Sequence, residues 1–98
     1  MLNKAYTKTG RSCRVTFKLQ PEINARTVNL CGEFNDWDFV AHPMRRLKNG
    51  GFTLILSLHP GRQYRFKYLL DGDRWENDSA ADGYVPNAFG SYDSIVNV

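Results

Sequence analysis

The sequence predicts an all-β protein, an immunoglobulin-like antiparallel β-sandwich of about seven short strands. Apolar residues recur at every second position in several short windows, and this period is typical of strands with one buried face. Turn-forming residues separate the windows at intervals of roughly 8 to 12 residues, as they do in sandwiches. No window shows the apolar stripe of an amphipathic helix, so the pattern favours sheets throughout.

The size of the chain fits one domain. Its 98 residues, of which 42% are hydrophobic, are enough for a single modest core without a disulfide or a metal. We expect residues 1–11 to be a frayed lead-in and residues 12–98 to form the sandwich. No apolar run approaches the roughly 18 residues that cross a bilayer, so no membrane partner is expected. Cys13 and Cys31 are too few for a disulfide framework and indicate buried thiols in the reducing cytoplasm.

Two strands are predicted in the first third of the chain. Residues 13–19 alternate strictly between apolar and polar side chains, and Pro21 ends this strand. Its inward face consists of Cys13, Val15, Phe17 and Leu19. Residues 27–32 repeat the pattern, and Gly32 marks a position where a side chain would obstruct a bulge or a close backbone approach.

The clearest strands are residues 52–58 and 64–70, which a tight turn at residues 59–61 connects. The Asn49-Gly50 pair favours a type I′ hairpin, because both residues readily adopt positive φ angles. We therefore expect residues 44–47 to pair with the strand that follows.

A second hairpin is predicted at Asp71-Gly72-Asp73, with residues 74–76 as its return arm. Residues 94–98 form a last short strand. Between them, residues 77–92 lose the alternation and are expected to form a long loop, and loops of this length are usually functional or disordered. The loop contains two large aromatic residues, Tyr84 and Phe89.

The charged residues argue against several functions. The 13 Lys and Arg and the 10 Asp and Glu, a net charge of +3, are spread along the chain without a dense basic patch, so nucleic acid is not an expected partner. His42 and His59 lie beside prolines in turn-like contexts and have no nucleophile signature nearby. The acidic residues after Asp71 lack the glycine and glutamate spacing of a calcium loop, and a small sandwich offers no deep cleft for facing carboxylates. We expect no catalysis, no metal and no cofactor.

Two tryptophans lie at strand margins. Trp37 follows the turn formers Asn35 and Asp36, and Trp75 follows the second hairpin. Each could instead fill one end of the core, since Trp is highly buried on average. Lys67 lies on the polar face of the strand that leads to Trp75. A flat apolar side chain beside a long hydrogen-bond donor suits a sugar, whose ring has an apolar face and a rim of hydroxyl groups.

Four blocks of the chain resemble the family 48 carbohydrate-binding modules. This family includes the early-set domain of isoamylases and glycogen branching enzymes and the glycogen-binding domain of the AMP-activated protein kinase β subunit. The blocks are residues 28–37, Gly51-Phe52, residues 61–72 with Trp75, and residues 87–96. The resemblance covers residues 15–98, and the order and spacing of the blocks are specific.

The resemblance implies a non-catalytic module that binds α-1,4-glucan, such as glycogen, starch or maltooligosaccharide. In kinase-type members, two tryptophans stack on glucose rings, a lysine of the penultimate long strand bonds to hydroxyl groups, and the last loop supplies further contacts. The matching positions in this sequence are Trp37, Trp75, Lys67, Phe89, Ser91 and Asp93.

Two positions depart from the kinase-type pattern. Asp93 stands where an asparagine is expected, and an aspartate accepts hydroxyl protons but does not donate. Arg74 is an extra residue before Trp75, which could rotate that ring. The alternative function is a protein-interaction or regulatory early-set module that docks on a glycan-metabolising enzyme, because a sandwich edge with exposed aromatic residues also suits a protein partner.

Overall fold

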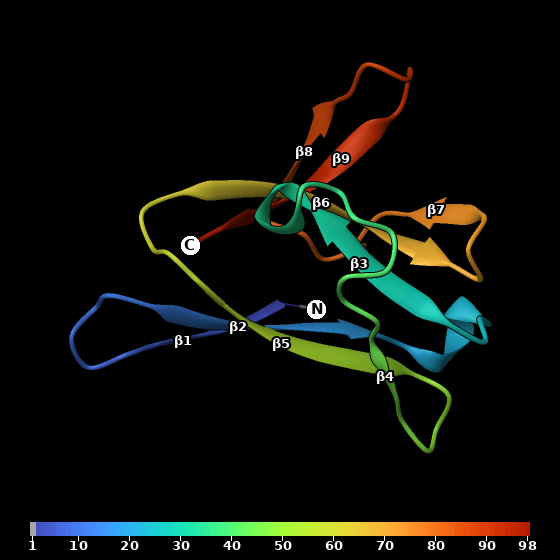
Figure 1. The fold of residues 1–98 in the computed structure, drawn as a ribbon, viewed down its shortest axis with the longest axis horizontal. Helices are drawn as coiled ribbons and strands as arrows, with labels where there is room; N and C mark the ends of the chain where they lie inside the picture. Colours follow the sequence, from blue (N-terminus) through green and yellow to red (C-terminus); the bar gives the residue numbers. More distant parts are fainter. Residues whose placement is uncertain (1) are drawn as a thin grey trace.

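The computed structural model describes residues 2–98 and is drawn as a ribbon in Figure 1. Within this range it has two antiparallel β-sheets and no α-helix, so the predicted all-β sandwich is confirmed. The strands are β1 (Leu2–Tyr6), β2 (Cys13–Leu19), β3 (Val28–Gly32), β4 (Arg45–Arg46), β5 (Phe52–Leu58), β6 (Gln63–Leu70), β7 (Arg74–Glu76), β8 (Gly83–Pro86) and β9 (Tyr92–Asn97). Two short 3₁₀ helices, η1 (Pro21–Ile23) and η2 (Glu33–Asn35), follow β2 and β3.

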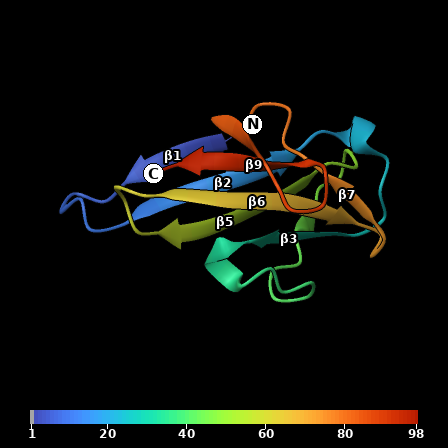
Figure 2. The ribbon, with the colours of Figure 1, turned by 90° about the horizontal axis from the view of Figure 1, so that it is seen from above.

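The two sheets form two layers. The four-stranded sheet has the order β1-β2-β5-β4, and the other sheet has the order β3-β6-β9-β8 with β7 paired to β6. Figure 1 shows the layers edge-on, with the β8–β9 hairpin extending away from the four-stranded sheet. Seen from above in Figure 2, β6 and β9 of one layer run along nearly the same line as β2 and β5 of the other. This aligned packing is the common arrangement of two twisted sheets.

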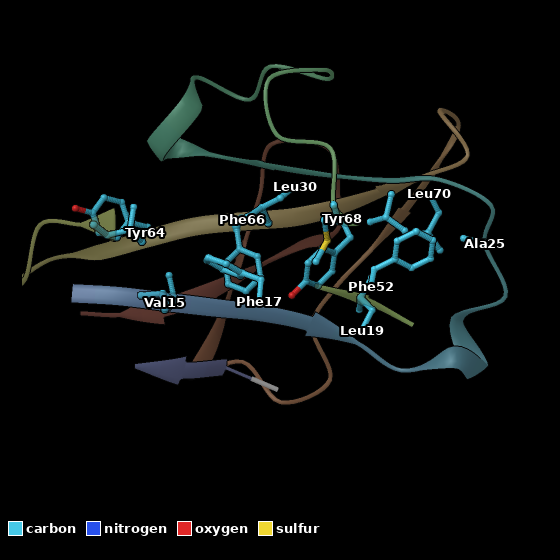
Figure 3. Packing of buried hydrophobic residues seen from close by; sticks show 14 of the residues in the cluster. Val15, Phe17, Leu19, Ala25, Leu30, Phe52, Tyr64, Phe66, Tyr68 and Leu70 are labelled. Carbon is cyan, nitrogen blue, oxygen red and sulfur yellow. The ribbon is translucent and has the colours of Figure 1, made fainter. Parts of the chain in front are cut away.

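The core lies between the layers and is dominated by aromatic rings (Figure 3). Phe17 of β2 contacts Phe66 of β6 edge-to-face, with ring centroids 5.2 Å apart, and Phe66 contacts Tyr68 at 5.7 Å. All three side chains have no exposed surface. Because such rings bury much apolar area, this cluster provides much of the hydrophobic stabilisation of the sandwich.

Strand β6 has two different faces, as its alternation predicted. Tyr64, Phe66, Tyr68 and Leu70 belong to the core cluster. Arg65, Lys67 and Leu69 therefore lie on the outer face of the second sheet. A Cβ atom added to Gly32, on neighbouring β3, would lie 2.6 Å from the Arg65 carbonyl oxygen, so the close approach predicted at this glycine is confirmed.

Both predicted hairpins form, one of them with a different turn. Asp71 and Gly72 have φ angles of 53° and 77°, the geometry of a type I′ turn between β6 and β7. The β4–β5 hairpin instead turns through a hydrogen bond from Gly50 N–H to the Leu47 carbonyl, and of its residues Gly50 alone has a positive φ, 90°. The type I′ prediction at Asn49-Gly50 was wrong, because the loop is one residue longer and needs the glycine at its end.

Two segments expected to lack structure are strands. Leu2–Tyr6, predicted to be frayed, forms β1 and pairs along its whole length with β2. Gly83–Pro86, predicted to lie in the long loop, forms β8 and pairs with β9, which begins at Tyr92 instead of residue 94. Both are edge strands, where a proline is tolerated and one row of backbone groups needs no partner. Their pairing therefore depends on the neighbouring strand more than on their own apolar pattern.

A buried polar contact fastens the segment between β7 and β8 to the sandwich. The Tyr68 hydroxyl donates to Asp78 Oδ2 at 2.7 Å, and the Asp78 N–H donates to Ser94 Oγ at 2.9 Å. Burial raises the pKa of Tyr68 well above its ordinary value of 10.0, and the Asp78 charge and hydrogen bond raise it further. The hydroxyl therefore remains a proton donor to Asp78 across the whole physiological pH range.

Candidate functional site

A surface depression of about 1070 Å³ lies on the outer face of the second sheet. The six residues that the sequence predicts for carbohydrate binding all line it: Trp37, Trp75, Lys67, Phe89, Ser91 and Asp93. The other lining residues are Glu33, Phe39, Arg65, Asn87 and Ala88. The depression thus brings together the β3–β4 connection, β6, β7 and the β8–β9 hairpin, which lie far apart in the sequence.

Trp37 is placed by a tight exit from β3. Asp36 and Trp37 both have left-handed backbone conformations, with φ angles of 53° and 58°, and the Trp37 N–H donates to the Gly32 carbonyl at 2.9 Å. Asn35 fixes this turn, because its Oδ1 accepts from Gly32 N–H at 3.0 Å and its Nδ2 donates to the Leu30 carbonyl at 2.9 Å. A left-handed backbone is rare for a bulky residue and concentrates at functional positions. Trp37 is half-buried at the wall of the depression.

Trp75 pairs edge-on with Phe39, a residue that no sequence pattern indicates. Their ring centroids lie 5.5 Å apart at an angle of 71°, and both side chains are exposed, to 43% and 57%. The available signal was weak, since Phe39 is a single aromatic residue two positions after Trp37 in a turn-rich loop. The Arg74 guanidinium is engaged by other groups, with Nη2 donating to the Asn24 carbonyl at 3.4 Å and to Asp71 Oδ2 at 3.5 Å. Trp75, which follows Arg74 directly, lines the depression.

Lys67 lies on the outer face of β6 as predicted, but it is covered there. Only 9% of the residue is exposed, and its Nζ donates to the Tyr92 carbonyl at 3.0 Å and to Ser91 Oγ at 3.5 Å. The β8–β9 hairpin covers the side chain there, since both hydrogen-bond partners of the ammonium belong to that hairpin. Lys67 thereby joins the floor of the depression to the hairpin.

The tip of the β8–β9 hairpin is held by Asn87. Its Oδ1 accepts from the backbone N–H groups of Phe89 and Ser91, at 3.0 and 3.1 Å. The backbone N–H of Asn87 donates to the Ser91 carbonyl at 2.9 Å. These bonds present Phe89 at the rim with 92% of its surface exposed. A large apolar side chain so exposed on a well-bonded loop indicates a contact surface.

Asp93 lies in the same wall, engaged by protein groups. Its Oδ1 accepts from Asn87 Nδ2 at 3.0 Å, and its Oδ2 lies 3.8 Å from Arg65 Nη1. The Asp93 side chain is 9% exposed. On the neighbouring side, Glu33 Oε1 accepts from the Arg65 backbone N–H at 2.7 Å. Arg65 is therefore in contact with both carboxylates of the lining, Asp93 and Glu33.

The thiol of Cys31 lies beneath this region, opposite Lys67 in the β3–β6 register. Burial raises the pKa of Cys31 from 9.0 to about 11, and the charge of Asp38 contributes to the shift. The thiol is therefore neutral at physiological pH and unsuited to nucleophilic chemistry. No group of three His, Cys, Asp or Glu suited to a metal occurs in residues 2–98, and no helix in that range is long and apolar enough to cross a membrane.

Comparison with known proteins identifies the family. The family described as carbohydrate-binding module 48 (isoamylase N-terminal domain) matches residues 10–85. The chain is 41% identical over 76 residues to the 1,4-alpha-glucan branching enzyme GlgB of Photobacterium profundum, a match that covers 74% of this chain and 10% of the enzyme. It is 38% identical over 55 residues to Protein PTST homolog 2, chloroplastic, of Arabidopsis thaliana, covering 56% of this chain and 10% of that protein. The chain thus spans about a tenth of the length of these relatives. It belongs to the carbohydrate-binding module 48 family.

Proposed function

We propose that this protein binds α-1,4-glucan without catalysis, as glycogen, starch or maltooligosaccharide, by stacking glucose rings on Trp37 and Trp75. The observation that supports this most directly is that both indoles line one depression together with Lys67. The names of relatives such as 1,4-alpha-glucan branching enzyme support the same ligand class. The free cysteines Cys13 and Cys31 favour a cytoplasmic setting.

The chemistry of the lining suits a sugar chain. The apolar C–H face of a glucose ring packs on an indole, while its equatorial hydroxyl groups need donors and acceptors at the edge. Here the aromatic lining residues include Trp37, Trp75 and Phe89, and the polar lining residues include Lys67, Ser91 and Asp93. Lys67 retains donor capacity for hydroxyl groups, since an ammonium has three N–H groups and two are used. We expect a dissociation constant between ~1 μM and ~1 mM for maltoheptaose.

Retention on an amylose resin tests this function. The wild type should be retained and be released by free maltoheptaose, whereas Trp37→Ala and Trp75→Ala should pass through. Tyr6→Ala is the matched control, because Tyr6 is an exposed aromatic residue, 55% exposed, outside the depression. Circular dichroism establishes that each variant folds. A folded wild type that fails to bind the resin and maltoheptaose rejects the proposal.

A second candidate, docking on a glycan-metabolising enzyme, is favoured by the charge distribution. In the four-stranded sheet, strands β1, β2 and β4 contain basic residues, and none of the four strands contains Asp or Glu. Their basic residues are Lys4, Arg14, Lys18, Arg45 and Arg46. Lys4 is ion-paired with Asp82 at 2.6 Å, whereas the other four are exposed and suit an acidic protein surface. Co-purification with and without amylase separates the two functions, since an association bridged by glucan disappears on digestion.

A further inference from the structure

Arg65 occupies the polar floor of the depression. It lies two residues before Lys67 on the outer face of β6, and its side chain is 43% exposed. Its backbone position is fixed by the bond from its N–H to Glu33 Oε1, 2.7 Å long. The side chain thus starts from a rigid strand and reaches a surface open to a ligand.

The guanidinium is oriented from one side. Nη1 lies 3.5 Å from the Pro86 carbonyl and 3.8 Å from Asp93 Oδ2. Asp93 is itself fixed, because its other oxygen accepts from Asn87 Nδ2 at 3.0 Å. Within residues 2–98, the guanidinium interacts with other protein groups through Nη1 alone. A guanidinium has five N–H donors in a planar fork, so the Nη2 and Nε donors remain for a ligand.

We propose that Arg65 is a ligand-binding residue of this site, that its free N–H groups bind two neighbouring hydroxyl oxygens of one glucose ring, and that Asp93 is its positioning residue. This inference rests on the proposed glucan function. Two parallel N–H groups match two adjacent equatorial oxygens, as they match the paired oxygens of a carboxylate.

The charge of the site favours a neutral sugar over a phosphorylated one. The lining contains two cations, Arg65 and Lys67, and two carboxylates, Glu33 and Asp93, so its formal charges cancel. A phosphate at Arg65 would also approach the Asp93 carboxylate and be repelled by it. Neutral hydroxyl groups meet no such penalty, and they can donate to the same carboxylates.

The role of Asp93 follows from its contacts. Its side chain is 9% exposed and faces two protein donors, so it acts on the ligand chiefly through Arg65. Removing its charge should free the guanidinium to adopt other rotamers and so increase the entropy lost on binding. The effect of an Asp93 substitution should therefore depend on whether Arg65 is present.

Isothermal titration of the 98-residue chain with maltoheptaose tests this inference. Arg65→Gln should weaken binding about tenfold, the loss expected for hydrogen bonds from a charged donor. Asp93→Asn, which keeps an oxygen for Asn87, should weaken it about threefold in the wild type and have no effect in the Arg65→Gln background, since residues that act as a unit are not additive. Arg14→Gln is the matched control for charge, because Arg14 is exposed on β2 outside the depression.

A second titration identifies the hydroxyl pair. β-Cyclodextrin methylated at oxygens 2 and 3 should bind the wild type more weakly than the unmodified ring, and Arg65→Gln should reduce that difference. Arg65→Gln with wild-type affinity, or additive losses in the double variant, would overturn the inference and leave the glucan function intact. Binding of inorganic phosphate that shifts the Arg65 Nε–H resonance while maltoheptaose does not would also overturn it. If the wild type binds no glucan, both the inference and the proposed function fail.

Discussion

Phe39 packs edge-on against Trp75, with ring centroids 5.5 Å apart and ring planes at 71°. The contact joins the β3–β4 connection to β7, a strand of three residues paired only with β6 among the strands of residues 2–98. Trp75 would otherwise stand on a short edge element with freedom to rotate. Phe39 therefore reduces the entropy that Trp75 loses when a ligand stacks on it.

Phe39→Ala should weaken maltoheptaose binding by about 2- to 10-fold, because an aromatic pair contributes about 0.5–1.5 kcal/mol beyond its buried area. Isothermal titration measures the change. Val40→Ala is the matched control, since Val40 is the next residue, is 77% exposed and does not line the depression. Equal affinities for Phe39→Ala and wild type would show that Trp75 needs no support.

Lys67→Met should weaken glucan binding more than it destabilises the fold. The Tyr92 carbonyl keeps a second donor, Asn77 Nδ2 at 3.0 Å, so removing the ammonium leaves no buried acceptor without a hydrogen bond there. We expect a loss of about 1 kcal/mol in the free energy of unfolding, the usual contribution of one hydrogen bond. Urea denaturation and titration with maltoheptaose compare the two effects. A large loss of stability with unchanged affinity would assign Lys67 a purely structural role.

Stability should fall with increasing pH between 9 and 11 because of Cys31. Its pKa is about 11 in the folded protein and 9.0 ordinarily. Above pH 9 the unfolded chain has therefore lost a proton that the folded chain keeps, and unfolding becomes more favourable as pH rises. Cys31→Ala should show a flatter decline in the free energy of unfolding over this interval, measured by urea denaturation at several pH values. Parallel profiles for the two proteins would exclude the thiol as the cause.

Tyr68→Phe should lower the free energy of unfolding by about 1–3 kcal/mol, because it removes the hydroxyl that donates to the buried Asp78. Glucan affinity should not change, since Tyr68 faces the core and not the depression. Tyr64→Phe is a suitable comparison. The Tyr64 hydroxyl donates to the backbone carbonyl of His59, which is exposed, so water can replace the hydroxyl there. A Tyr68→Phe protein as stable as the wild type would contradict a structural role for the Asp78 contact.

The strands that can be predicted from the sequence are those with one buried face. In β2, β5 and β6 the spacing of apolar residues reflects the core directly. The edge strands β1 and β8 escaped prediction because they have no fully buried residue, and their pairing is imposed by β2 and β9. The hydrogen bonds that pair these strands are made by backbone groups, so no pattern of side chains marks them in the sequence.

The candidate site divides in the same way. Trp37, Trp75 and Lys67 could be selected because a flat side chain near a donor has a recognisable chemistry and because the block order resembles a family. Arg65 and Phe39 could not, since their roles depend on partners distant in sequence, Asp93 and Trp75. Only the register of β6 with its neighbours and the course of the β3–β4 connection bring these groups together.

The most direct test of glucan binding is an NMR titration of the two indole N–H resonances. The chain contains 2 tryptophans, so the spectrum of the ¹⁵N-labelled protein holds one indole signal for Trp37 and one for Trp75. Stacking of a single glucan chain predicts that both signals shift on addition of maltoheptaose and saturate with one common dissociation constant. If neither signal moves at ~10 mM maltoheptaose, well above the weakest expected dissociation constant of ~1 mM, the two tryptophans do not form a glucan platform.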